Sequence, residues 1–337
     1  MLEVLIVNQS EVPALLPVKE CVDVMARTFA AHARGETTLP VRQILWLPER
    51  VGALGLMPAH LSSQAALGVK AVTFFPRNEG TDLDSHQGAV LLFEAGRGRL
   101  LAVIDATSVT AVRTAAVSGL ATRLLAQPEA GDLAIIGSGV QARTHLEAMI
   151  AVRTLRRVRV ASKTIARARS FAEREGKRHQ IAIEPCETVR EAVDGADIVC
   201  TVTSSREPVV QGEWLSPGVH VNAVGSSVST ARELDAAAVA RSRFFVDHRE
   251  SALVEAGDFL LARKEGAVGD AHIVGDMGEL VTGSVPGRTS PSDVTVFKSV
   301  GLAIEDVAAA QHIYTKVRGG SNLGKSIPFG GERHDAD

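Results

Sequence analysis

Cysteine is scarce in this chain, and its scarcity excludes two kinds of architecture. Three cysteines occur among 337 residues, at Cys21, Cys186 and Cys200. They are too few and too scattered to form a disulfide framework or a metal cluster. We therefore expect no metal site, and thiols of this kind suit a reducing cytoplasm.

Aromatic residues and a strong net charge are also missing. Aromatic residues make up 4% of the chain and hydrophobic residues 45%, and the formal net charge is −3. This composition fits a globular α/β protein and excludes a disordered or fibrous one. Because no basic field is present, nucleic acid is not an expected partner, although local arginines can still bind small anions.

Long apolar runs are absent as well. No stretch reaches the roughly 18 apolar residues of a membrane span. The segment Met1–Val7 lacks the basic leader and the cleavage site of a signal peptide. The sequence therefore predicts a soluble, cytoplasmic protein without a membrane partner.

What the chain does contain is a glycine fingerprint after a short apolar strand. The strand Asp132–Ile136 runs directly into Gly137, Ser138, Gly139, Val140, Gln141 and Ala142. The first glycine permits a tight turn, the second lets backbone N–H groups approach a pyrophosphate, and the small Ala142 lets the helix pack on the strand. An ordinary glycine turn is the alternative. The strand before it and the helix predicted over 140–153 supply the context that a dinucleotide site requires.

Strand-like and helix-like segments alternate beyond the fingerprint. Strands are expected at 158–162, 181–183, 197–203, 220–224 and 243–246, and helices at 164–175, 187–193, 233–240 and 250–263. This alternation predicts a doubly wound (Rossmann) parallel sheet. Gly137, Ser162, Thr203 and Gly225 all fall along its carboxyl edge, where a dinucleotide would lie.

The part of the chain before the fingerprint follows another pattern. A helix is expected at 18–34, and apolar runs at 44–47, 54–57, 69–75, 89–94 and 100–104 are separated by glycine and proline turns. These runs predict a mostly antiparallel sheet. Helices are also expected at 109–126 and 303–318, and the second of these would pack back on the first domain. We therefore expect a discontinuous α+β domain of residues 1–113 plus 303–337 and a Rossmann dinucleotide-binding domain of residues 114–302.

Several phrases, spread over nearly the whole chain, resemble the ornithine cyclodeaminase and mu-crystallin family. They are Met57-Pro58-Ala59, Gly68-Val69-Lys70-Ala71-Val72-Thr73, Ser85-His86-Gln87-Gly88, Ala111-Val112-Arg113-Thr114-Ala115-Ala116, Asn222-Ala223-Val224-Gly225 and Val296-Phe297-Lys298-Ser299-Val300-Gly301. The resemblance implies a homodimer whose discontinuous domain supplies the dimer contact and a substrate pocket facing the nicotinamide. Members of this family reduce imines of α-keto acids, dehydrogenate alanine, or cyclise ornithine with release of ammonia.

Three cations are candidates for holding a substrate carboxylate, which planar bidentate donors hold well. The resemblance carries this role onto Arg42, Lys70 and Arg113. The alternative is that they are solvated surface charges. Lys70 lies in the apolar run 67–75 and Arg113 in an Ala- and Val-rich segment, so we expect both to be partly buried and to need an anionic partner.

Three further polar residues have two interpretations each. His86 would shape the pocket or deliver a proton to a substrate nitrogen, or it is a core or turn histidine. Asn222 would lie at a strand end beneath the nicotinamide, or cap a loop. Lys298 would lie at the coenzyme pocket, or it is a structural lysine whose head reaches solvent.

The end of the second Rossmann strand indicates the coenzyme. Domains that bind NAD place an acid there for the ribose 2′-hydroxyl. This chain instead reads Ser162-Lys163-Thr164, followed by Arg167. Cations at this place can neutralise a 2′-phosphate, so NADP(H) is favoured over NAD(H). The alternative is that Lys163 and Arg167 are ordinary charges at a helix start.

One departure from the cyclodeaminase pattern distinguishes the activities. Cyclodeaminases carry an aspartate after the Asn-Ala-Val-Gly phrase that acts as base toward the substrate amine, and Ser227 stands there in this chain. A serine without a partner is no base near neutral pH. Gly55 likewise leaves no carboxylate where cyclodeaminases hold the distal amine. Mu-crystallin-like reductases also lack the aspartate.

The expected function is therefore an NAD(P)H-dependent reductase of small 2-imino or cyclic ketimine carboxylates, such as pyrroline- or piperideine-2-carboxylate, giving L-amino acids. Lys70, Arg113 and His86 are the expected catalytic residues, and Ser227 joins the cations at the substrate. The alternatives are a reductively aminating L-alanine-type dehydrogenase, an ornithine cyclodeaminase, and a non-catalytic NADP(H)-binding protein.

Overall fold

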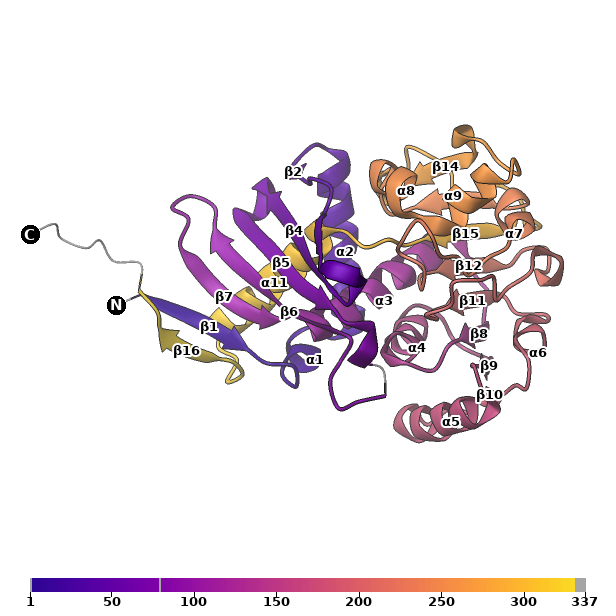
Figure 1. Ribbon diagram of the computed structural model, residues 1–337, viewed down its shortest axis with the longest axis horizontal. Helices are drawn as coiled ribbons and strands as arrows, with labels where there is room; N and C mark the ends of the chain where they lie inside the picture. Colours follow the sequence, from indigo (N-terminus) through magenta and orange to yellow (C-terminus); the bar gives the residue numbers. More distant parts are fainter. Residues whose placement is uncertain (1, 79, 331–337) are drawn as a thin grey trace, which may run out of the picture. The chain divides into compact units, whose positions relative to one another are not determined.

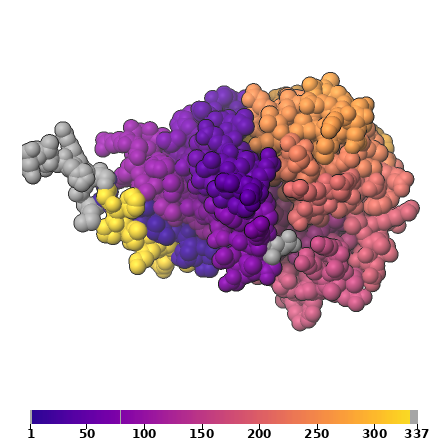
Figure 2. Space-filling model, viewed as in Figure 1, coloured from indigo at the N-terminus to yellow at the C-terminus, as the bar shows by residue number. Residues whose placement is uncertain are grey.

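The computed structural model describes residues 2–78 and 80–330, and the contacts within the chain divide it into two compact units. The discontinuous unit runs up to Arg113 and resumes at Leu302, whereas the Rossmann unit is Thr114–Gly301. Helix α3 (Ala106–Leu125) passes from the first unit into the second. Figure 1 shows the elements, and Figure 2 shows the surface in the same sequence colours.

The Rossmann unit is built on an eight-stranded sheet, and its strand pairs are parallel. The order is β10 (Glu184–Pro185), β9 (Arg157–Ala161), β8 (Asp132–Ile136), β11 (Ile198–Thr201), β12 (His220–Ala223), β15 (Thr295–Lys298), β13 (Arg243–Val246) and β14 (Ile273–Asp276). After β8 the chain adds β9 and β10 on one side and then β11 and β12 on the other (Figure 1). Such a reversal leaves a crevice at the carboxyl ends of the strands, where α/β sheets bind ligands.

The helices of this unit are α4 (Val140–Val152), α5 (Ile165–His179), α6 (Val189–Val193), α7 (Ala236–Ala240), α8 (Arg249–Glu255), α9 (Gly257–Lys264) and α10 (Met277–Thr282). The doubly wound parallel sheet expected from the alternating pattern is therefore confirmed. The central strands β8, β11 and β12 are buried at every position except Asp132, and β8 and β11 read as largely apolar runs, as strands covered on both faces do.

The discontinuous unit contains a second eight-stranded sheet, which is mostly antiparallel as expected. The path is β16 (Lys325–Pro328), β1 (Glu3–Val7), β7 (Leu100–Asp105), β6 (His86–Glu94), β5 (Ala66–Phe74), β4 (Ala53–Leu61) and β2 (Thr37–Thr38), and β3 (Gln43–Trp46) also pairs with β4. Among the strand pairs of this sheet in the described residues, β1 and β7 run parallel to each other and the others are antiparallel.

Helix α11 (Ala303–Arg318) is the core element of the discontinuous unit. It packs on β4, β5 and β6, and α2 (Val18–Ala33) packs on it, while the short α1 (Val12–Leu15) touches its side. Gly68 permits this approach, because a Cβ atom there would lie 2.8 Å from Val307 Cγ2. The helix begins and ends at the residues expected from the sequence, and its return to the first sheet is also confirmed.

Several elements differ from the expectation. The single helix expected at 250–263 is two helices, α8 and α9, because Ala256 leaves the helical conformation. The strand expected at 181–183 is β10, moved to Glu184–Pro185 since α5 continues to His179. The strands β1, β2, β14, β15 and β16 and the short helices α1 and α10 were not expected from the sequence. Within the described residues, no helix combines the length and the apolar character that crossing a bilayer requires.

Candidate functional site

The loop between β8 and α4 has the backbone of a dinucleotide turn. Gly137 has φ +129°, and a Cβ atom there would lie 2.8 Å from the carbonyl oxygen of Val202. Gly139 caps α4 without a side-chain hydrogen bond, and a Cβ atom at Gly139 would meet no atom within 4 Å. The start of α4 therefore has no side-chain cap, and there is open space beside Gly139, which fits the approach of a pyrophosphate.

The side chains beside this turn add polar atoms. Ser138 Oγ lies 2.7 Å from Ser162 Oγ, which joins the end of β8 to the end of β9. The buried Gln141 Oε1 has no hydrogen-bond partner among the described residues. Val140 is 48% exposed although it is apolar. An unsatisfied buried acceptor and an exposed apolar side chain beside an uncapped helix start fit a ligand site.

The start of α5 carries the two predicted phosphate-binding cations. Thr164 caps the helix through a hydrogen bond from the Arg167 backbone N–H at 3.4 Å, and no acidic residue lies in the first turn. Lys163 and Arg167 are both exposed, and neither side chain forms an ion pair within the described part of the chain. Both cations are therefore available to an anionic ligand at the end of β9.

Thr203 and Gly225 lie beyond the ends of β11 and β12, as expected. Their backbone N–H groups both donate to the buried carboxylate of Glu233, at 2.6 Å each. Burial raises the pKa of Glu233, although the Lys298 charge and the hydrogen bonds from Thr203 act against this rise. Ser227 is half-buried in the loop that follows Gly225.

The side chain of Asn222 has its hydrogen-bond partners inside the Rossmann unit. Its side chain is fully buried and donates to Thr122 Oγ1 at 2.9 Å. His220 Nε2 lies 3.3 Å from its carbonyl oxygen, and Cys200 Sγ lies 3.8 Å from its nitrogen. The alternation of the strand turns Asn222 toward Thr122 of α3, so its side chain belongs to an internal polar network.

Lys298 differs from the expectation of a head that reaches solvent. It is fully buried at the end of β15, and its Nζ lies 3.0 Å from Asp258 Oδ2 and 3.2 Å from Ser226 Oγ. The head therefore does not reach solvent, and its described partners are Asp258 and Ser226. Burial acts to raise the pKa of Asp258, but the Lys298 charge and the hydrogen bonds outweigh it and lower that pKa.

In the discontinuous unit, Lys70 and Arg113 share one carboxylate. They are 3% and 4% exposed. Asp306 of α11 places Oδ2 at 2.8 Å from Lys70 Nζ and accepts from Arg113 Nε through Oδ1 at 2.9 Å. Glu305 accepts from Arg113 Nη1 at 2.6 Å. The expectation that both cations are partly buried and need an anionic partner is confirmed, and the partners lie on α11.

Arg42 lies within electrostatic range of Lys70. Burial lowers the pKa of Lys70 to about 8, and the charges of Arg113 and Arg42 lower it further while Asp306 raises it. We define Arg42, Lys70, Arg113, Glu305 and Asp306 as the cation cluster. Three cations against two carboxylates leave the cluster with one net positive charge, which would attract an added carboxylate.

His86 lies next to this cluster at the start of β6. Its ring lies 4.7 Å from the Phe74 ring, centroid to centroid, and Nδ1 is 3.1 Å from Ser85 Oγ. Desolvation by its neighbours, followed by the Lys70 charge, lowers the pKa of His86. The imidazole is therefore neutral near pH 7. His86 is exposed, so the core-histidine alternative does not hold.

The sequence analysis missed the acids that organise both units: Glu305, Asp306, Glu233 and Asp258. A signal was present for the first two, because an adjacent acidic pair interrupts an otherwise apolar run at 303–310. Buried acids require cations. No comparable pattern identifies Glu233 or Asp258, since both stand among ordinary helix and loop residues.

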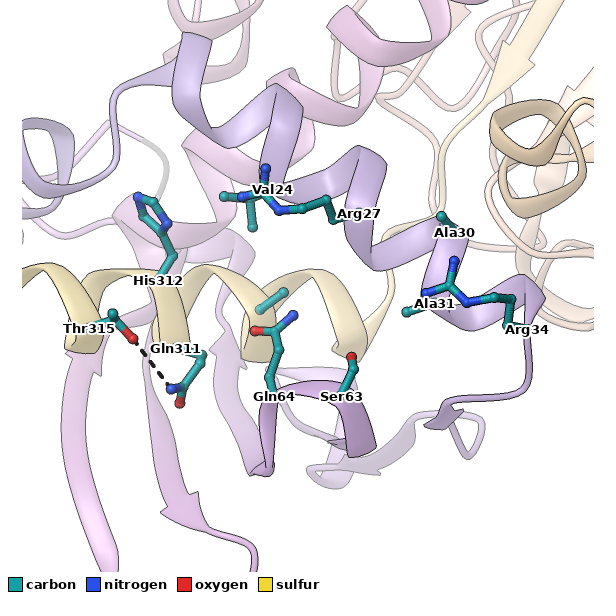
Figure 3. Close-up of a pocket in the computed structure, with 11 residues that line it drawn as sticks. Val24, Arg27, Ala30, Ala31, Arg34, Ser63, Gln64, Gln311, His312 and Thr315 are labelled. Carbon is teal, nitrogen blue, oxygen red and sulfur yellow. Dashed lines mark hydrogen bonds between the residues drawn. The ribbon is translucent and has the colours of Figure 1, made fainter.

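An open groove of about 430 Å³ lies between α2, α11 and the short helix at Ser62–Gln64 (Figure 3). Arg27 and Arg34 reach it from α2, and Gln311 and His312 from α11. None of the predicted site residues lines it. The groove is therefore separate from the cation cluster, and no site is assigned to it.

Comparisons with known proteins agree with this geometry. A model of the ornithine cyclodeaminase/mu-crystallin family matches residues 3–321. The chain is 41% identical to the ketimine reductase mu-crystallin of Mus musculus over 286 residues, which cover 85% of this chain and 87% of the relative.

Solved structures are similar over almost the whole chain. The Δ1-pyrroline-2-carboxylate reductase of Thermococcus litoralis, in complex with NADH and L-proline, superposes with a TM-score of 0.93 at 37% identity and covers 96% of this chain and 100% of its own. An archaeal alanine dehydrogenase dimer with bound NAD gives a TM-score of 0.91 at 32% identity, with coverage of 97% and 100%.

Proposed function

Because the chain belongs to the ornithine cyclodeaminase/mu-crystallin family, we propose that it is an NAD(P)H-dependent reductase of small 2-imino or cyclic ketimine carboxylates that yields L-amino acids. The observation that carries the proposal is the cation cluster, in which Lys70 and Arg113 are buried and oriented by one carboxylate. Because the two cations are buried and held in place, they are suited to bind the carboxylate of a small molecule and not the surface of another protein.

The chain's own residues bind and orient the substrate. Arg113 and Arg42 hold the substrate carboxylate, and Lys70 shares that negative charge. Asp306 fixes the positions of Lys70 and Arg113 before the substrate arrives. A nicotinamide coenzyme, when bound, would supply the hydride that reduces the imine carbon. Holding the double bond in one orientation accounts for most of the acceleration, because it removes the entropic cost of alignment.

The protein does not need a strong acid to protonate the imine nitrogen of the substrate. A ketimine nitrogen is often protonated near neutral pH, so no strong acid is required. The buried Lys70, whose pKa is lowered to about 8, and the exposed His86 are the titratable groups we assign to proton exchange with the substrate. Ser227 lies in the loop where cyclodeaminases carry their base, and it cannot abstract a proton from an amine. These features favour reduction over ornithine cyclisation.

For the coenzyme we propose a preference for NADP(H) over NAD(H). Exposed Lys163 and Arg167 at the end of β9, with no acid in the first turn of α5, support it. Two similar proteins of known structure hold NADH or NAD, so the preference for NADP(H) has to be measured for this chain itself.

For the assembly we propose a homodimer formed through the discontinuous unit. All four residues of β3 are exposed, although three of them are the apolar Ile44, Leu45 and Trp46. Two further exposed apolar residues lie beside this strand. Val41 comes two residues before it in the chain, and Leu56 of β4 pairs with Gln43 of β3. Exposed apolar side chains gathered at a sheet edge are typical of a protein interface. The archaeal relative that is described as a dimer supports a second copy as the partner.

For the location we propose the cytoplasm. Cys21, Cys186 and Cys200 are all free thiols and buried. Burial raises the pKa of Cys200 to about 12, so this thiol does not ionise at physiological pH. Free thiols are typical of proteins in a reducing compartment.

Substitution of Arg113 tests the proposed function. Arg113→Ala should raise the KM for a ketimine at least about tenfold, because a charge-assisted contact to the substrate is lost. Coenzyme affinity should stay unchanged, since that site lies in the Rossmann unit. Undiminished ketimine reduction by this variant would show that the cluster does not bind substrate.

The second candidate is a dehydrogenase that reductively aminates an α-keto acid, favoured by the similarity to the archaeal alanine dehydrogenase. It would use the same cation cluster but would also require free ammonia. Rates with a ketimine alone and with pyruvate plus ammonium separate the two functions.

A further inference from the structure

Glu233 connects the ends of two neighbouring strands. Its Oε1 accepts from the Thr203 backbone N–H, just beyond β11, at 2.6 Å. Its Oε2 accepts from the Gly225 backbone N–H, just beyond β12, at 2.6 Å and from Thr201 Oγ1 at 2.8 Å. One fully buried carboxylate therefore holds both loops through three hydrogen bonds.

The loops are held unusually close at this point. A Cβ atom at Gly225 would lie 2.1 Å from the Thr203 carbonyl oxygen and 2.5 Å from Glu233 Oε1. Only glycine fits there, so the carboxylate and the two strand ends form one packed unit.

A second ion pair fixes the segment that carries Glu233. Asp258 Oδ1 accepts from the backbone N–H groups of Glu233 and Leu234 at 2.7 and 2.8 Å. Asp258 Oδ2 accepts from Ser226 Oγ and pairs with Lys298 Nζ. Lys298 ends β15, the strand beside β12, so three successive strand ends are joined through two buried acids.

The position of this network in the sheet indicates its use. The glycine fingerprint follows β8, and the cations for a ribose phosphate follow β9, so the adenosine half of a dinucleotide belongs to that side. The ends of β11 and β12 lie on the other side of the reversal, where the second mononucleotide half binds.

We propose that Glu233 is a positioning residue that preorganises the Thr203 and Gly225 loops to receive the nicotinamide half of the coenzyme, with Asp258 and Lys298 anchoring it. The inference rests on the proposed use of a nicotinamide coenzyme and does not depend on which imine is reduced. A purely structural role would leave coenzyme affinity unchanged in a folded variant, which separates the two roles.

The test compares two buried glutamates of the same unit. In Glu233→Gln the side chain has one acceptor oxygen, whereas the backbone N–H groups of Thr203 and Gly225 each need one. One of the two loops therefore loses its hydrogen bond to residue 233. Glu175→Gln is the matched control, because Glu175 is also fully buried but pairs with Arg174 on α5 and touches neither loop. NADPH and NADH affinities are measured by fluorescence titration without substrate, and folding by circular dichroism.

We expect Glu233→Gln to lower the affinities for NADPH and NADH about tenfold or more, and both by the same factor. The control Glu175→Gln should bind both coenzymes as the unaltered protein does. Thr201→Val removes one of the three hydrogen bonds with little change in shape, and should weaken binding about threefold, which keeps the test decisive if Glu233→Gln does not fold. Unchanged affinity in Thr201→Val and in any folded Glu233→Gln overturns the proposal, as does an equal loss in the control. Binding that follows this pattern while no imine is reduced would refute the proposed function and leave the role of Glu233 intact.

Discussion

Asp306 Oδ2 lies 2.8 Å from Lys70 Nζ, and both side chains are almost completely buried. The same carboxylate receives Arg113 Nε through its other oxygen. A single acid on α11 therefore sets the separation of two cations that come from β5 and α3. The cation cluster is thus assembled from segments about 190 to 240 residues apart in sequence.

The first prediction concerns this acid. Asp306→Asn should raise the KM for a ketimine about tenfold, because Lys70 and Arg113 lose the charge that orients them. The free energy of unfolding should fall by about 3 kcal/mol, since two buried cations lose a partner. Steady-state kinetics and denaturant unfolding measure the two effects.

A matched control is Glu36→Gln, which breaks the more exposed pair that Arg34 and Glu36 form at 2.6 Å in the same unit. Both KM and stability should stay as in the unaltered protein. If Asp306→Asn behaves like this control, the cluster does not depend on Asp306.

The second prediction concerns pH. The pKa of Lys70 is lowered to about 8, mainly by burial, so its positive charge is lost above that pH. The kcat/KM for a ketimine should therefore fall as pH rises through about 8, because this ratio reports the free enzyme. Lys70→Arg keeps its charge at all accessible pH values, so any activity that remains should lack this fall.

Stability depends on the same group with the opposite sign. Between the folded pKa of about 8 and the unfolded value of 10.5, the unfolded chain binds more protons at Lys70 than the folded chain does. The contribution of Lys70 to the free energy of unfolding therefore rises with pH over this window. A Lys70→Met variant should lack this rise, and an identical pH dependence in the variant would contradict the lowered pKa.

The third prediction concerns coenzyme choice. The double variant Lys163→Ala and Arg167→Ala should raise the KM for NADPH about tenfold or more and leave the KM for NADH within about twofold, because only NADPH carries the 2′-phosphate. Lys177→Ala is the control, since Lys177 lies exposed on the same helix and pairs with Glu173. A preference for NADH in the unaltered protein would show that these cations have no role in coenzyme choice.

The fourth prediction concerns the fingerprint turn. A Cβ atom at Gly139 would meet no protein atom within 4 Å, so Gly139→Ala should fold as the unaltered protein does. It should nevertheless bind coenzyme about tenfold more weakly, because the methyl group occupies the space that the pyrophosphate requires. Gly269→Ala, at another position with open space around it, should change neither property. Normal coenzyme affinity in Gly139→Ala would place the pyrophosphate elsewhere.

The sequence was sufficient for the elements whose signals are local. The fingerprint at 137–142 lies in one continuous segment, and helix 303–318 has no interruption, so the type of both elements was predicted correctly. The break between α8 and α9 was not predicted. At the start of α9, a Cβ atom at Gly257 would lie 1.9 Å from the carbonyl oxygen of Ala231, and this constraint comes from a segment that is distant in the sequence.

The candidate site divides in the same way. Lys70 and Arg113 were found because a cation in an apolar segment is conspicuous and because the family phrases contain them. The buried partners of Asn222 and Lys298 were not predicted, since a strand sequence does not show which neighbour its polar side chains bond to. The partners of these residues, Thr122 and Asp258, lie 100 and 40 positions away in the chain.

Reduction of a cyclic ketimine is the most direct test of the central claim. The purified protein is given Δ1-pyrroline-2-carboxylate or Δ1-piperideine-2-carboxylate with NADPH and, in parallel, NADH, and both coenzyme oxidation and the amino-acid product are followed. The account predicts that one coenzyme is consumed per L-amino acid formed, without added ammonium. It would be contradicted if neither coenzyme were oxidised, if turnover required a keto acid with ammonium, or if ornithine released ammonia without net coenzyme use.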